Sequence, residues 1–144
     1  MFGCEDSIEG RWPASMIAMI EGVRTHVAEV RESLPTTLDA YLLDDRRASI
    51  VRRSLFTAVQ WAVETAEVFV MHLDKGVDRR YENAFEALAQ HAVLDSEVAN
   101  RMVDLARRFR PGPLGAGPRE VFEGARNACL DLGVFCAALR RRLP

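Results

Sequence analysis

Arginine side chains gather at two places in the sequence where they could bind an anion. Arg107, Arg108 and Arg110 directly precede a segment rich in proline and glycine, and residues 140–142 are three consecutive arginines near the end of the sequence. A guanidinium group donates hydrogen bonds in a fixed fork that matches a phosphate or a carboxylate, so either cluster could contact RNA or an acidic protein. Cations in the last turn of a helix also interact favourably with the helix dipole, and this structural role is the alternative interpretation.

Imidazole is well suited to acid–base chemistry near neutral pH, and the chain has three histidines: His26, His72 and His91. His72 and His91 fall on different expected helices, and no carboxylate is spaced so as to point at either ring. The local sequence therefore does not predict a catalytic histidine.

Metal and nucleotide sites are not indicated. Glu64, Glu67 and Asp74 belong to one expected helix, whereas a di-metal bundle needs a Glu-x-x-His step on two helices, and no helix of this chain has one. The glycines within residues 112–117 are interleaved with prolines, which lack the amide donors of a phosphate-binding loop. We expect neither a metal nor a cofactor.

The cysteines and large aromatic residues have simpler interpretations. Cys4, Cys129 and Cys136 include no Cys-x-x-Cys pair, so a disulfide framework or a zinc site is not expected. Cys129 and Cys136 lie seven residues apart on an apolar stripe, where a free cysteine packs as a small hydrophobic residue. Trp61 and Phe69 are expected to pack in the core or against a second copy.

Composition limits the class of protein. The 144 residues are 49% hydrophobic and 28% charged, which is typical of one globular domain. A formal net charge of -2 gives no global attraction to nucleic acid or an anionic membrane. The opening residues 1–6 are acidic, and no apolar run approaches the roughly 18 residues of a membrane span, so we expect a cytoplasmic protein without a secretory signal or membrane contact.

Hydrophobic periodicity predicts an all-α protein. Apolar residues recur at three- and four-residue steps, and no segment alternates with period two. Asp95 is expected to cap a helix and Pro118 to begin one. The wide apolar face of the longest helix indicates a central position or a second face that packs on another copy. We expect an up-and-down antiparallel bundle of four or five helices, over about residues 13–34, 46–74, 81–90, 96–109 and 118–142.

From about Asp44 onward, the order of features resembles the HepT-like branch of the HEPN superfamily, helical ribonuclease toxins paired with MntA-like nucleotidyltransferase antitoxins. The resemblance covers about two-thirds of the chain. It depends on the long helix from Ile50 to Leu73, on residues 83–88 (NAFEAL), 92–99 (AVLDSEVA) and 101–103 (RMV), and on Asp131, Leu132 and Phe135 in the last helix.

The resemblance implies a toxin–antitoxin protein that dimerises through its long helices and holds a ribonuclease motif in the cleft between the copies. In the family the motif is an arginine, usually an asparagine, three further residues, a histidine, one residue and a tyrosine. Counted from Met102, these four positions are Ala106, Arg107, Pro111 and Pro113, and no histidine or tyrosine occurs from residue 101 to the end of the sequence. Loss of a general acid–base group typically costs about 10²- to 10⁴-fold in rate.

Three functions follow as hypotheses. The first is a non-catalytic homodimeric binding or regulatory module that retains the fold and binds a nucleotidyltransferase-like or other partner. The second is an active metal-independent ribonuclease that uses Arg107, Arg108 or Arg110 with His72 or His91 from elsewhere in the bundle, which requires one of these histidines within about 6 Å of the arginines across the dimer. The third is an unrelated helical interaction protein.

Overall fold

The computed structural model describes residues 14–73, 83–110 and 116–143. These residues form six helices and no strand, so the prediction of an all-α bundle is confirmed. The helices are α2 (Ala14–Ser33), α3 (Leu38–Leu43), α4 (Asp45–Leu73), α5 (Ala84–Gln90), α6 (Ser96–Arg108) and α7 (Pro118–Arg142).

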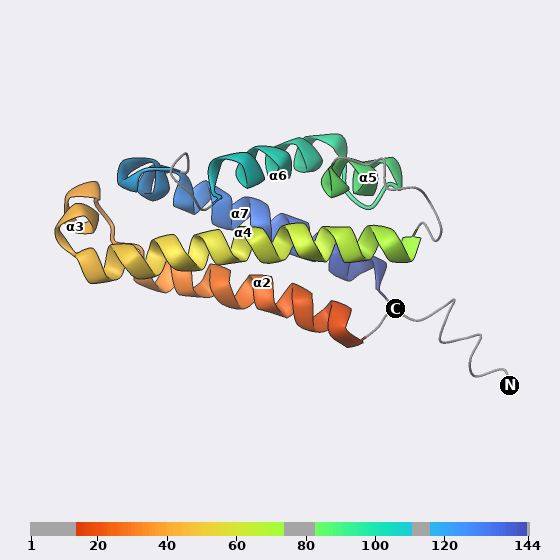
Figure 1. Cartoon of the computed structure of the whole chain (residues 1–144), viewed down its shortest axis with the longest axis horizontal. Helices are drawn as coiled ribbons and strands as arrows, with labels where there is room; N and C mark the ends of the chain where they lie inside the picture. The colour runs from red at the N-terminus through yellow and green to blue at the C-terminus, as the bar shows by residue number, and fades with distance from the viewer. Residues whose placement is uncertain (1–13, 74–82, 111–115, 144) are drawn as a thin grey trace, which may run out of the picture.

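The four longer helices, α2, α4, α6 and α7, form an up-and-down bundle (Figure 1). α2 packs against α4 and α7, and α6 packs against the same two helices from the other side. Within the described residues α2 and α6 do not contact each other, whereas α4 and α7 meet across the middle. Each of α2 and α6 runs antiparallel to both of its neighbours, as short connections favour.

α4 occupies the central position that its wide apolar face predicts, because it contacts each of the other described helices. Phe69 is fully buried, whereas Trp61 remains 36% exposed and packs along the outside of α2. Packing within one chain therefore accounts for most of this face. Its buried residues are Val51, Ser54, Leu55, Phe56, Ala58, Val59, Ala62, Thr65, Ala66 and Phe69.

The short helix α3 is a correction to the sequence prediction, which left residues 36–45 as a connection. Thr37 caps α3 by accepting a hydrogen bond from the backbone N–H of Ala40 at 3.1 Å. Tyr41 is the buried residue of α3, and its ring lies 5.4 Å from that of Phe122 on α7. Six residues are too few for a periodic stripe, so only the cap could have indicated this helix.

The turn from α5 to α6 sets where α6 begins. The helix predicted from residue 81 begins at Ala84, after Asn83 caps the N–H of Phe85 at 2.8 Å. Ala92 follows α5 with φ of 60°, in a Schellman motif whose outer hydrogen bond joins Val93 N–H to Leu88 C=O at 2.9 Å. Asp95 then accepts from the N–H of Val98 at 3.0 Å, which confirms the predicted cap.

α7 begins and packs as its sequence predicts. Pro118 is its first residue, and Glu120 Oε1 accepts the N–H of Gly117 at 3.2 Å. Cys129 and Cys136 are buried in the core, and burial raises the pKa of the Cys136 thiol to about 12. A thiol with so high a pKa is scarcely ionised at neutral pH, which fits a packing role. No described helix is long and apolar enough to cross a membrane.

Candidate functional site

The C-terminal end of α6 is anchored to the core by Phe109, which is 1% exposed. Its backbone N–H donates to the carbonyl of Leu105 at 2.9 Å and closes the last turn of the helix. Its ring centroid lies 6.4 Å from that of Phe56 on α4. On the α7 side the ring lies against Gly124, where an added Cβ would come within 2.7 Å of the Phe109 ring. The arginines around Phe109 therefore project from a fixed backbone.

Arg108 is held by contacts within α6. Its Nε lies 3.0 Å from Asp104 Oδ2, and its guanidinium lies 5.1 Å from the centroid of the Phe109 ring. Across the α6/α7 boundary, burial raises the pKa of Asp131, while the charges of Arg101 and Arg108 lower it and the charge of Asp104 raises it further. Arg108 is thus part of a mixed network of exposed charges, which weakens it as a dedicated phosphate ligand.

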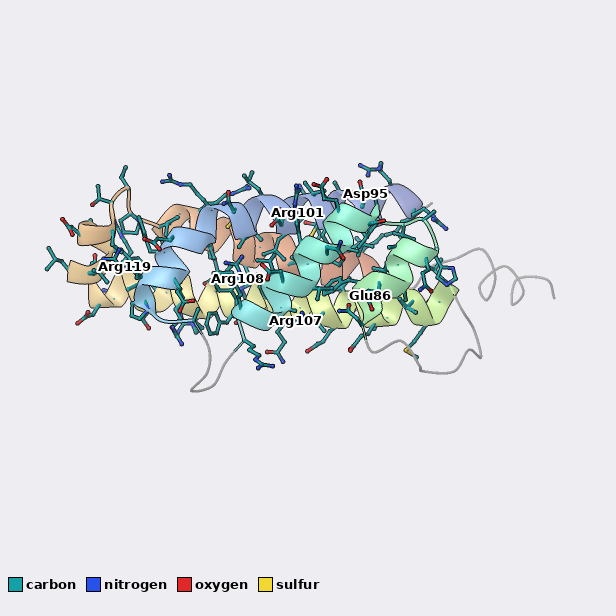
Figure 2. All side chains as sticks on the ribbon, turned by 90° about the horizontal axis from the view of Figure 1, so that it is seen from above. Glu86, Asp95, Arg101, Arg107, Arg108 and Arg119 are labelled. Atoms are coloured by element: carbon teal, nitrogen blue, oxygen red, sulfur yellow. The ribbon has the colours of Figure 1, made fainter. Side chains whose placement is uncertain are left out.

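Arg107 and Arg110 differ from Arg108 in their partners. Both side chains are exposed, and among the described residues neither has a carboxylate within 4 Å. In Figure 2, Arg107 lies on the α4 side of α6, whereas Arg101 and Arg108 lie toward α7. Two guanidinium groups with no ion pair within this part of the structure are available to an anionic group on another molecule.

Arg52 of α4 joins this end of α6, although the sequence reasoning missed it. Its guanidinium lies 4.6 Å from the centroid of the Phe56 ring and donates to the carbonyl of Ala116 at 2.7 Å. Phe56 contacts Phe109, and Phe109 contacts Arg108. Arg52 and Arg108 therefore each make a cation–π contact with one ring of the same aromatic pair. The spacing of Arg52 and Phe56, four residues apart on a helix, was the available signal.

The positions of the family motif contain no group that can transfer a proton. Ala106, where the resemblance places the arginine, is a half-buried alanine that packs against the core. Arg107 stands at the asparagine position and is exposed. Pro111 and Pro113 lie outside the described residues.

The histidines of the same chain lie away from the arginines of α6. Phe56 marks the level of these arginines on α4, and His72 lies 16 residues further along, or about 24 Å at 1.5 Å per residue. His91 precedes α6 and lies about 20 Å from its far end by the same measure. His26 belongs to α2, which does not contact α6. No group of three or more metal-binding side chains occurs among the described residues.

The second arginine cluster is divided by its contacts. Arg142 Nη1 donates to the carbonyl of His91 at 3.3 Å and ties the end of α7 to the α5/α6 turn. Arg140 and Arg141 are exposed. The three arginines therefore do not act as one site, and part of the cluster has a structural role.

A cluster of His26, Glu29 and Ser54 between α2 and α4 was also missed in the sequence. Glu29 Oε1 lies 2.9 Å from His26 Nδ1 and accepts a hydrogen bond from Ser54 Oγ at 3.1 Å. These two hydrogen bonds lower the pKa of Glu29. A nucleophilic triad would need the serine hydroxyl to donate to the histidine, and here both groups point to the carboxylate, so the cluster joins two helices instead.

Comparisons with known proteins add no family to this description. No family model matches the chain, and no curated protein sequence matches it.

Proposed function

We propose that this chain is a HepT-like helical protein of toxin–antitoxin type that acts as a non-catalytic homodimeric binding module. The observation that carries the proposal is Ala106, a half-buried alanine at the position where the HepT-like family that the chain resembles has its arginine. Cleavage through the 2′-hydroxyl needs one group that moves a proton and one cation that stabilises the phosphorane. The end of α6 has cations but no histidine among the described residues, and Asp104 there pairs with Arg108.

The arginines support binding instead of cleavage. Arg107 and Arg110 are exposed and have no ion pair within the described part of the chain, and Arg52 lies close by on the rings that anchor α6. An acidic surface of a nucleotidyltransferase-like partner fits these guanidinium groups, because interfaces align opposite charges. RNA bound through its phosphates is a weaker candidate, since the chain as a whole is acidic.

The competing function is a ribonuclease that brings a histidine to these arginines from the second copy. His72 and His91 of one chain lie about 20 Å or more from the arginines along α4 and α6, so these two histidines could serve only in an intermolecular site. The two exposed arginines are the observation that favours it.

The decisive test is cleavage of total tRNA and of a messenger fragment by the purified protein in a chelating buffer. The control variant has Arg107, Arg108 and Arg110 changed to alanine. We expect no cleavage by either protein, and a dimer at micromolar concentration by size exclusion with light scattering. Cleavage that disappears in the triple variant would overturn the non-catalytic assignment, and a monomer would overturn the homodimer.

A further inference from the structure

α7 presents an apolar stripe on the side that faces away from the core. Leu130 is 60% exposed and Val134 is 48% exposed, and Ala137 continues the stripe one turn later. The spacing of four and three residues places these side chains on one face of the helix. No described element of the chain covers Leu130 or Val134, so this face has no partner among residues 14–73, 83–110 and 116–143.

Charged residues of opposite sign mark the two ends of the stripe. Glu123 precedes it and Arg141 follows it, and both are exposed. They lie 18 residues apart, which is five full turns at 3.6 residues per turn, so they point in the same direction. Residue 132 is the midpoint of this charged pair and also of the pair formed by Leu130 and Val134.

This shared midpoint makes the stripe self-complementary. If two copies of α7 pack antiparallel about the level of Leu132, Leu130 of each copy lies opposite Val134 of the other. Glu123 of each copy then lies opposite Arg141 of the other, so opposite charges meet at both ends. A parallel pairing would place like charges opposite each other, which is unfavourable.

The ion pair between Arg119 and Glu123 does not prevent Glu123 from taking part in such an interface. Arg119 lies 3.4 Å from Glu123 within α7, but both side chains are more than half exposed, and exposed pairs of this kind are worth little. Beside the stripe, an open groove of about 460 Å³ lies between α2 and α7, and Gly133 and Ala137 line it on the α7 side. A Cβ at Gly133 would meet nothing within 4 Å, so side chains of a second copy have room there.

We propose that two copies of this chain associate through the α7 stripe, in an antiparallel two-fold arrangement centred at Leu132. The inference rests on the homodimer of the proposed function and names its interface. A two-fold axis uses the same surface of both copies, so each side chain named here contributes twice.

The first test introduces a charge into the stripe. Leu130→Glu should raise the dimer dissociation constant by about 100-fold or more, because two leucines lose their burial and two carboxylates enter the interface. Met71→Glu is the matched control, since Met71 is also 60% exposed but lies on α4. It should leave the dissociation constant within about twofold of the wild-type value, as measured by sedimentation velocity over a dilution series.

The second test exchanges the end charges. Glu123→Arg and Arg141→Glu should each weaken the dimer about three- to tenfold, because each places like charges together twice. The double variant Glu123→Arg with Arg141→Glu restores both pairs and should return the constant to within about twofold of wild type. Circular dichroism of each variant separates loss of the dimer from loss of the fold.

The outcomes separate this inference from the proposed function. A wild-type dimer that Leu130→Glu leaves intact would place the interface elsewhere and overturn the inference alone. Failure of the double variant to recover would overturn the antiparallel register. A wild-type monomer at micromolar concentration would overturn the homodimer itself, and the inference with it.

Discussion

At two helix–helix boundaries of this bundle an aromatic ring packs on a glycine, and the two rings differ in how deeply they are buried. Between α2 and α4, the ring of Trp61 lies on Gly22, and between α6 and α7 the ring of Phe109 lies on Gly124. Phe109 is 1% exposed and Trp61 is 36% exposed. The first ring therefore covers a surface, whereas the second is part of the core and fixes the end of α6 that carries the arginines.

The carboxylates of the two boundaries differ as well. Glu29, between α2 and α4, has a lowered pKa because His26 and Ser54 hydrogen-bond to it. Asp131, between α6 and α7, has a raised pKa because burial outweighs the nearby arginines. Ionisation thus stabilises the fold at one boundary and costs stability at the other. The α6/α7 boundary positions the arginines at the end of α6. It is also the boundary where the ionised form of the carboxylate, Asp131, is disfavoured.

The largest difference between the boundaries should follow from removing the two rings. Phe109→Ala should cost roughly 3 to 5 kcal/mol of unfolding free energy, because it leaves a cavity beside Phe56 and removes the ring under Arg108. Trp61→Ala should cost only about 1 to 2 kcal/mol, because part of that ring is already in water. Urea unfolding measures both free energies, provided that the slope of unfolding free energy against urea concentration is unchanged. Equal losses for Phe109→Ala and Trp61→Ala would contradict the difference between the two boundaries.

Adding a methyl group at each glycine gives the next largest effect. Gly124→Ala should destabilise by about 1 to 2 kcal/mol, because the buried Phe109 ring cannot move away from the new Cβ and this strain exceeds the gain in helix propensity. Gly22→Ala should destabilise by about 1 kcal/mol or less: the new Cβ would overlap the Trp61 ring, but this 36% exposed ring can move outward, and the gain in helix propensity offsets part of the packing that it loses. In a Phe109→Leu background, Gly124→Ala should become neutral; a persistent loss would mean that the strain arises elsewhere.

The smallest effect depends on pH. Glu29→Gln should cost about 0.5 kcal/mol or less at pH 7, since Glu29 is half exposed. Because the folded pKa is lowered from 4.5, this stabilisation is present above pH 4.5 and disappears as the pH falls through the lowered value. Asp131→Asn should be neutral or stabilising at pH 7, because its raised pKa makes ionisation costly above pH 3.8. Thermal melts of the Glu29→Gln and Asp131→Asn variants between pH 3 and 7 measure both effects. A Glu29→Gln variant more stable than wild type at pH 7 would contradict the claim that ionised Glu29 stabilises the fold.

Much of the fold could be predicted from the sequence because helices are local structures. The apolar stripe of α7, the cap at Asp95 and the start at Pro118 all follow from residues within a few positions of each other. α3 escaped prediction because its six residues bury only Tyr41. The candidate site was predicted in part: Arg107, Arg108 and Arg110 are adjacent in the sequence, but their different partners are not visible there.

Residue types and local spacing alone were enough to predict the class of fold and the core face of each longer helix, and to show that residues 101–144 contain no histidine or tyrosine. Only the tertiary structure brought Arg52 beside the end of α6, where its hydrogen bond reaches Ala116, 64 residues away in sequence. It also joined Ser54 to Glu29 and left Leu130 and Val134 uncovered. These features depend on how helices align across the bundle, which side-chain packing between distant segments decides and local periodicity does not encode.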